Sequence, residues 1–231
     1  NDPELGYSAY NIPHRIQASA YYHINYGAQK QWQTTVGLIY QAKSGSPYSI
    51  YYYGDVNEDG ANGNDLFFIP TDAQIDKMQF EETNFSANAL TKTVFGDNFT
   101  APKLTADMQR AMMKHWIGND SYMKNHRGEF YKRYADNLAF EHHFDVHFAQ
   151  KYSFKVGGQI NSLELSFDII NAGNMLNKNW GHTYGDGFGV YYSPVNYQRN
   201  GRYQFTGGYA TRNYSDYYSR WRGQLGLRYT F

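Results

Sequence analysis

The stretch that decides the fold covers residues 138–156 and reads LAFEHHFDVHFAQKYSFKV. Its apolar members are Leu138, Phe140, Phe144, Val146, Phe148, Tyr152, Phe154 and Val156. They lie on one side of an extended chain. The residues that alternate with them, including Glu141, His143 and Asp145, lie on the other side. This alternation predicts one long β-strand with an apolar face and a polar face. His142 and Gln150 interrupt the apolar face, so a bulge or a strand end can occur there.

The same alternation recurs in four other stretches. We expect strands at about 13–26, 32–42, 138–156, 162–171 and 219–231. Two long inserts separate them, at about 43–137 and 172–218, whereas the other two connections are short. Compact soluble domains seldom carry loops of that length. Outer-membrane barrels alternate short periplasmic turns with long extracellular loops, so the pattern predicts an all-β fold made of transmembrane antiparallel barrel strands.

Composition excludes several other classes of protein. The 231 residues carry 21 Lys+Arg and 21 Asp+Glu, and a nucleic-acid partner would require a basic excess. The absence of cysteine excludes disulfide scaffolds, zinc–thiolate sites and thiol catalysis. The 24 tyrosines are too many for a disordered chain, and several fall near strand ends, as the aromatic girdles of barrels require. No catalytic motif is present, so we expect no enzyme and no catalytic residues.

Five strands are too few to close a barrel. Single-chain barrels have at least eight strands, and an open edge in lipid would leave backbone groups without hydrogen bonds. We therefore expect the chain to be a piece of a larger barrel. Its first residue is Asn1 rather than Met, which favours this expectation. Because short turns face the periplasm, the C-terminus is expected to be periplasmic and these strands to be the last five.

Five segments together carry a resemblance to a known family. They are Asn11–Arg15; Gly54–Gly60 with Asn64–Leu66 and Ile69–Pro70; His126–Gly128; Phe167–Asn177 with Asn179–Gly181; and Leu227–Phe231. In this order they resemble the C-terminal barrel region of TonB-dependent outer-membrane receptors of Bacteroidota. The similarity is greatest to the Oar-like group, which is related to the SusC-type transporters, and it spans nearly the whole chain.

The resemblance implies that residues 1–231 are the C-terminal part of a 22-stranded barrel in the outer membrane of a Gram-negative bacterium. Such receptors import a nutrient without breaking a bond in it, driven by the TonB–ExbB–ExbD complex. The implied partners are the rest of the barrel, the N-terminal plug, outer-membrane lipid and, in many relatives, a surface lipoprotein of the SusD type.

The end of the chain has the pattern of a barrel-assembly signal. Its alternate apolar residues are Leu225, Leu227, Tyr229 and the terminal Phe231. Assembly machinery recognises such a last strand by pairing with its edge. The alternative is an ordinary edge strand that ends in Phe.

An acidic loop in the first insert has the spacing of a calcium loop, with oxygen ligands at positions 1, 3 and 5 and Gly60 at position 6. The expected Ca²⁺ ligands are Asp55, Asn57, Asp59, the carbonyl of Ala61 and Asp65. The loop departs from the EF-hand pattern because its closing acid is at position 11. The alternative is a turn rich in Asp and Asn side chains.

Three further groups of residues were considered as sites. The expected ligand-contacting tyrosines of the second insert are Tyr184, Tyr191, Tyr192, Tyr197 and Tyr203. His143, Asp145 and His147 share one strand face, where lining of the barrel lumen is favoured over chelation of a transition metal. Residues Thr105 to Trp116 have the spacing of a short amphipathic helix capped by Thr105.

The function expected from these observations is TonB-coupled import of a nutrient across the outer membrane. An alternative of a different class is a soluble secreted β-sandwich that is stabilised by calcium and binds carbohydrate through tyrosines. An adhesin or a passive pore is a third interpretation. Solubility without detergent separates the first two.

Overall fold

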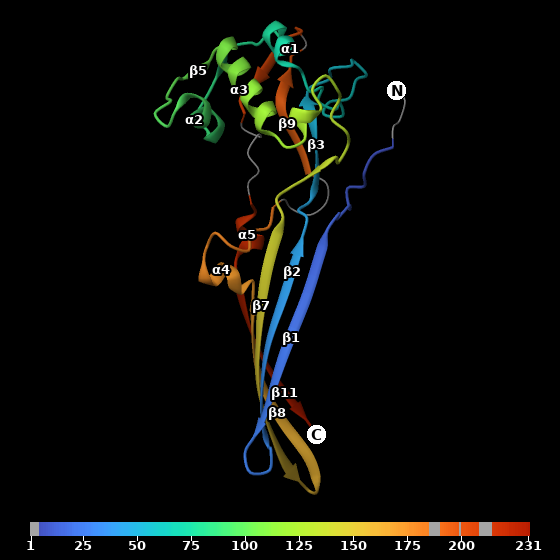
Figure 1. The fold of residues 1–231 in the computed structure, drawn as a ribbon, viewed down its shortest axis with the longest axis vertical. Coiled ribbons are helices and arrows are strands. Elements are labelled where there is room, and N and C mark those ends of the chain that lie inside the picture. The colour runs from blue at the N-terminus through green and yellow to red at the C-terminus, as the bar shows by residue number, and fades with distance from the viewer. Residues whose placement is uncertain (1–4, 185–189, 199, 208–213) are drawn as a thin grey trace. The chain divides into compact units, whose positions relative to one another are not determined.

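A computed structural model describes residues 5–184, 190–198, 200–207 and 214–231 (Figure 1). The chain is mostly β-structure, as expected, and its larger sheet is antiparallel. Two compact units are present, which we call the sheet unit (12–45, 139–185 and 214–231) and the insert unit (1–11, 46–138 and 186–213).

The sheet unit contains five antiparallel strands in the order β1-β2-β7-β8-β11. Their bounds are β1 Arg15–Tyr26, β2 Trp32–Lys43, β7 Glu141–Val156, β8 Gln159–Ile170 and β11 Arg222–Thr230. Two short helices, α4 Ala172–Leu176 and α5 Asp216–Ser219, belong to the same unit. The five strands correspond to the five alternating stretches. Within the described residues, β1 and β11 are the two edges of this sheet.

The register places the apolar residues of all five strands in rows on one face. The central row is Tyr22, Val36, Phe148, Phe167 and Leu225. A row nearer the hairpins is Tyr26, Trp32, Tyr152, Leu163 and Tyr229. These side chains are largely exposed; Leu225 and Leu227, for example, are 72% and 73% exposed. The sheet therefore has a continuous apolar face that is open to its surroundings.

The opposite face is polar and internally paired. His147 Nδ1 lies 2.5 Å from Asp168 Oδ1 on the neighbouring strand. The Tyr21 ring lies over Gly37, where a Cβ atom would approach the ring to 2.4 Å, so this position requires glycine. His23 Nδ1 and Thr35 Oγ1 are 2.9 Å apart. The polar face thus satisfies much of its hydrogen bonding across strands.

The hairpin turns of the sheet are short. Gly157 and Gly158 join β7 to β8 with φ values of 58° and 88°, and positive φ at both positions is what a type I′ turn requires. Residues 27–31 join β1 to β2. Figure 1 shows both turns at the same end of the sheet.

The insert unit shows that the long inserts expected at about 43–137 and 172–218 contain sheets and helices. Its main sheet has the order β10-β9-β3-β6, formed by β3 Pro47–Tyr53, β6 Asp136–Asn137, β9 Val190–Tyr197 and β10 Tyr203–Phe205. A small second sheet pairs β4 Thr83–Asn84 with β5 Lys103–Leu104. The helices are α1 Asp72–Lys77, α2 Ala89–Phe95, α3 Ala106–Asn119 and the 3₁₀ turn η1 Met123–Asn125. The extracellular location of these inserts stays a prediction.

Burial on both faces explains why β3 was missed. Its sequence PYSIYYY is buried at every position except the last, so it shows no alternation of polar and apolar residues. β3 also pairs in parallel with β9, an exception to the antiparallel arrangement expected. Alternation of polar and apolar residues identifies only strands that have one polar or solvent-exposed face.

Helix α3 supplies the core of the insert unit. Thr105 caps it by accepting a hydrogen bond from the Met108 backbone N–H at 3.3 Å, which confirms the expected helix start. Its Trp116 ring lies 5.6 Å from Phe67 and 5.2 Å from Phe205. The fully buried Gln109 donates to the carbonyls of Glu81 and Leu104 and accepts from the Phe205 N–H. This one side chain ties three backbone segments together.

No helix in the described part of the chain combines the length and the apolar character needed to cross a bilayer.

Replacing Gln109 with Met should destabilise the insert unit by about 3 kcal/mol, because three buried backbone groups lose their partner while the side-chain volume is nearly kept. Hydrogen exchange of the Ala106–Asn119 peptide measures this. Ala111→Met, at an exposed position of the same helix, is the control and should exchange as the parent does. Equal protection in the two variants would contradict the role assigned to Gln109.

Candidate functional site

Strand β7 extends beyond its partner β8. The β7–β8 pairing begins at Val146↔Ile169, whereas β7 itself starts at Glu141 and pairs there with Lys43 of β2. The first five residues of β7 therefore have a strand on one side only. On the other side, the chain leaves β8 and continues as the segment 171–184, which begins with α4.

The polar side chains of β7 hold this segment in place of a strand. Asp145 Oδ1 accepts a hydrogen bond from the Asn171 N–H at 2.7 Å, and Glu141 Oε1 accepts one from the Tyr184 N–H at 2.9 Å. Between them, His143 Nε2 lies 3.3 Å from Thr183 Oγ1. His143 and Asp145 thus anchor a loop, and His147 pairs with Asp168. In the described residues, no group of three or more His, Cys, Asp or Glu side chains has the geometry to hold a metal.

Asn171, the first residue of the segment, holds it in place through its own side chain. It adopts the left-handed conformation, with φ 56° and ψ 48°, which Asn tolerates better than most residues. Its Nδ2 donates to the carbonyls of Gly181 at 2.8 Å and Ser219 at 2.7 Å. The Thr183 N–H in turn donates to Ser219 Oγ at 3.0 Å. The loop is therefore fixed to β7 and to the residues just before β11.

Glu141 is a buried charge with a compensating partner. Its side chain is 2% exposed, and the Lys43 ammonium lies 3.5 Å from Oε2. That oxygen has no hydrogen bond of normal geometry. An ion pair with a buried member is costly to break by removal of its partner. Glu141 holds the loop through the hydrogen bond from the Tyr184 N–H.

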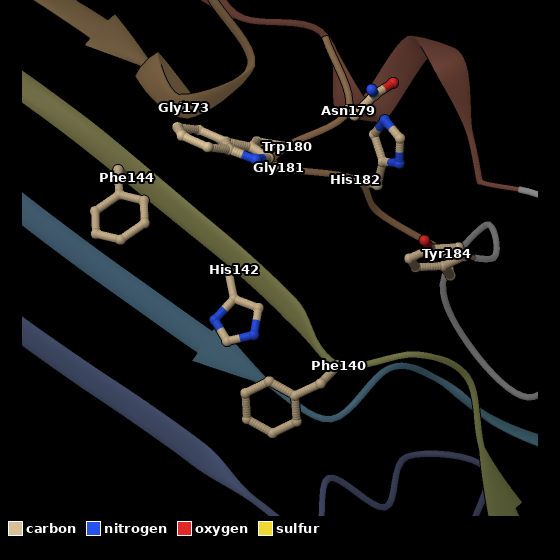
Figure 2. A pocket seen from close by; sticks show the side chains of 9 residues that line it. All are labelled: Phe140, His142, Phe144, Gly173, Asn179, Trp180, Gly181, His182 and Tyr184. Carbon is tan, nitrogen blue, oxygen red and sulfur yellow. The ribbon is translucent and has the colours of Figure 1, made fainter. Parts of the chain in front are cut away.

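The other face of β7 and this loop line an open pocket of ≈ 300 Å³. Its β7 wall is Phe140, His142 and Phe144, and its loop wall is Gly173, Asn179, Trp180, Gly181, His182 and Tyr184 (Figure 2). A Cβ atom on Gly173 would lie 3.8 Å from the Phe144 ring and 3.9 Å from the Trp180 Cβ atom, so α4 lies next to both residues. All of these residues belong to the sheet unit.

Contacts with neighbouring side chains fix the orientation of the pocket walls. The Tyr40 hydroxyl lies 2.8 Å from His142 Nδ1, and the Tyr40 ring lies 4.6 Å from Phe144. On the loop side, His182 stacks on Tyr214 at 3.8 Å with 10° between the rings. His182 Nε2 also lies 2.9 Å from the Lys178 carbonyl oxygen. The pocket is preformed, and its lining suits a ligand with an apolar body and one polar end.

The predicted calcium loop is held by its own hydrogen bonds. Asp55 accepts from the backbone N–H groups of Asp59 and Gly60 at 3.1 and 2.9 Å. Asp65 Oδ2 accepts from Val56 N–H at 2.7 Å, and Asp59 Oδ1 from Ala61 N–H at 2.9 Å. The bond from Ala61, followed by those from Asn57 and Asn64, lowers the pKa of Asp59. Calcium binding stays a prediction, as does its Asx-turn alternative.

The predicted ligand tyrosines are divided between the two units. Tyr184 lines the pocket of the sheet unit. In the insert unit, Tyr192 lies 5.5 Å from Tyr48, and Tyr197 lies 5.3 Å from Tyr203. Burial raises the pKa of Tyr203. The Tyr191 side chain lies outside the described residues. The three described tyrosines of the insert unit thus pack within it, and ligand contact by any of the five stays a prediction.

The predicted assembly residues share the apolar face of β11 and the chain end. Leu225, Leu227 and Tyr229 pair across to Phe167, Leu165 and Leu163, and Phe231 stacks on Tyr229 at 5.8 Å. Their role in assembly stays a prediction.

Sequence reasoning found only Tyr184 among the pocket residues. Except for His182, the other members lie in the segments used for the family resemblance or at the start of the long strand, and none was assigned a site role. A usable signal was Asn171 at the end of the strand predicted at 162–171, followed by Asn179, Trp180 and His182 within a short segment.

Comparisons of the chain with protein-family models, curated proteins and solved structures found no match. Function is therefore argued from residues and geometry alone.

Replacing Asn171 should loosen the 177–184 loop. Asn171→Ala loses two buried hydrogen bonds and strains a left-handed position, which together cost about 3 kcal/mol. Asn171→Gly loses the same bonds without the strain and should cost roughly 1–2 kcal/mol less. Hydrogen exchange over residues 177–184 reports the difference. Unchanged protection in Asn171→Ala would contradict the anchoring role.

Proposed function

We propose that the chain is the C-terminal part of the barrel of a TonB-coupled outer-membrane transporter that binds and imports a nutrient. The observation that supports a barrel wall is the apolar face of the five-stranded sheet, whereas TonB coupling and nutrient import are what the resemblance of the sequence segments implies. Its partners would be the rest of the barrel, the plug, TonB–ExbB–ExbD, outer-membrane lipid and, as in many receptors of this kind, a surface lipoprotein.

Exposure of the apolar rows favours a lipid environment. Water-soluble monomers seldom expose contiguous apolar patches of more than a few hundred Å², and each Å² of apolar surface left in water costs about 25 cal/mol. The rows continue across all five strands, from Tyr22 on β1 to Leu225 on β11. Lipid chains cover such a face without requiring a second protein layer.

The height of the apolar face agrees with a bilayer. Between Trp32 and Tyr40 the strand rises about 27 Å, at roughly 3.4 Å per residue. At the 35–45° tilt of barrel strands this length corresponds to a height of about 19–22 Å, and barrels present an apolar band of about 25 Å. Aromatic side chains lie at both ends: Trp32 and Tyr152 lie 4.4 Å apart near the hairpins, and Tyr40 and Phe144 lie 4.6 Å apart at the far end. Girdles of this kind border the lipid-facing band of a barrel.

The edges of the sheet favour a larger assembly. β1 and β11 have one strand neighbour each in the described residues, and unpaired backbone groups are expensive in lipid. Further strands on both sides would satisfy them. The polar face, with His147 and Asp168, would then line the interior.

The soluble β-sandwich alternative requires a second layer over the apolar rows. Leu225 and Leu227 are exposed, which supports a soluble β-sandwich less than it supports a sheet that faces lipid.

Substitution on the two faces of β11 separates these proposals. Leu225 lies in the central apolar row, so Leu225→Arg should destabilise the bilayer-inserted protein by about 2–4 kcal/mol, as expected for Arg near the midplane. Gln224→Arg, one residue away on the polar face, is the matched control and should change stability little. Urea unfolding of the natural polypeptide in lipid vesicles measures both. A harmless Leu225→Arg would argue against lipid contact.

Calcium binding by the acidic loop is a separate proposal, supported by the ligand spacing. Calorimetry with CaCl₂ should show a dissociation constant of about 10⁻⁴–10⁻³ M, as in extracellular modules. Asp55→Asn should weaken it, whereas Glu58→Gln, which removes a carboxylate outside the ligand set, should not. Because the pKa of Asp59 is lowered, its ionised form should persist below about pH 4 and be lost only as pH falls through the lowered value. Absence of heat at millimolar Ca²⁺ would remove this proposal.

A further inference from the structure

We propose that the pocket between β7 and the 171–184 loop binds one acyl chain of an outer-membrane lipid, with the polar end of that lipid at Asn179 and His182. This inference rests on the proposed function, because it needs the apolar face of the sheet to meet lipid. It adds a specific lipid site that the barrel proposal does not require.

The pocket is continuous with the apolar face. Phe144 lies on that face beside Tyr40, which in turn pairs with Ala18 of β1. Beyond Phe144, the same side of β7 presents His142 and then Phe140 (Figure 2). A chain lying against the sheet can therefore pass from the general apolar surface into the pocket without crossing a polar barrier.

The polarity of the lining changes along the pocket. Phe144 and Trp180 form the end nearest the apolar rows, and both carry rings suited to an acyl chain. Asn179, His182 and Tyr184 form the loop side, and Figure 2 shows them grouped away from Phe144. The Asn179 side chain is exposed and makes no hydrogen bond to another described residue, so its amide is open to a head group. A lining that is apolar at one end and polar at the other matches a ligand with an apolar chain and a polar head group.

A soluble saccharide fits the same lining less well. A sugar can stack the C–H face of its ring on one aromatic side chain, but its hydroxyls point outward around that ring, and any that are directed at a second apolar wall would lose water without gaining a partner. An acyl chain has no such groups. The chemistry of the walls therefore favours a lipid over a free sugar.

The loop does not have to fold around the ligand. Asn171, Glu141 and Asp145 already fix its ends, and Asn174 Nδ2 donates to the carbonyls of Lys178 and Trp180 at 3.2 and 3.0 Å. A preformed wall lowers the ordering cost of binding, which distinguishes a retained lipid from the mobile lipid around a barrel.

The test uses the natural polypeptide extracted from the membrane fraction, delipidated in detergent and incubated separately with lipid A and with phosphatidylethanolamine. Native mass spectrometry counts retained lipid. The parent should retain one molecule of at least one probe, and the probe retained identifies its source. Trp180→Ala and His142→Ala should each lower the bound fraction about tenfold, which corresponds to roughly 1.4 kcal/mol. Trp221→Ala is the control, because Trp221 has a similar exposure of 47% against 56% for Trp180 and does not line the pocket.

Other results would overturn the inference in distinguishable ways. Equal retention in the parent and in Trp180→Ala and His142→Ala, or an equal loss in Trp221→Ala, would remove the lipid site and leave the barrel proposal standing. Retention of maltohexaose in place of either lipid would assign the pocket to a saccharide. Recovery of the polypeptide from the soluble fraction without detergent would overturn the proposed function itself.

Discussion

The structure of the sheet unit depends on one constraint, which is that its apolar face has to be kept from water. Five strands present that face in register, and the row from Tyr22 to Leu225 crosses all of them. Because the side-chain period of a strand is two, a shift of one residue in any pairing would put polar groups into the row. The register of the sheet, the aromatic ends of its strands and the short glycine turn at Gly157–Gly158 are all consistent with a wall that meets lipid on one side.

The same alternation builds the pocket. Along the first part of β7, Glu141, His143 and Asp145 point to the polar face and hold the 171–184 loop where strand pairing has stopped. His142 and Phe144 point to the apolar face and form the opposite wall of the pocket. One short length of strand thus supplies both the anchors of the loop and the surface that the loop faces. The site exists because β7 is longer than β8.

The strands of the sheet unit could be predicted from sequence because each has one polar face, and helix α3 because Thr105 precedes residues at helical spacing. β3 could not be predicted in this way, since Tyr48, Ser49, Ile50 and their neighbours are buried on both faces. The pocket could not be predicted either. It depends on where the β7–β8 pairing ends, at Val146, and on the left-handed turn at Asn171. Both are tertiary features, and periodicity carries no information about them.

We propose that alternate residues of these strands face lipid on one side of the sheet and water on the other. The chain contains no cysteine, so single cysteines carrying a spin label can be placed along β2 without background. In the natural polypeptide folded into a bilayer, labels at Val36 and Leu38 should collide mainly with lipid-soluble oxygen, and labels at Gln33 and Thr35 mainly with a water-soluble nickel chelate. A period of two in this ratio is the predicted result. Equal access of the nickel chelate to all four positions would contradict the account.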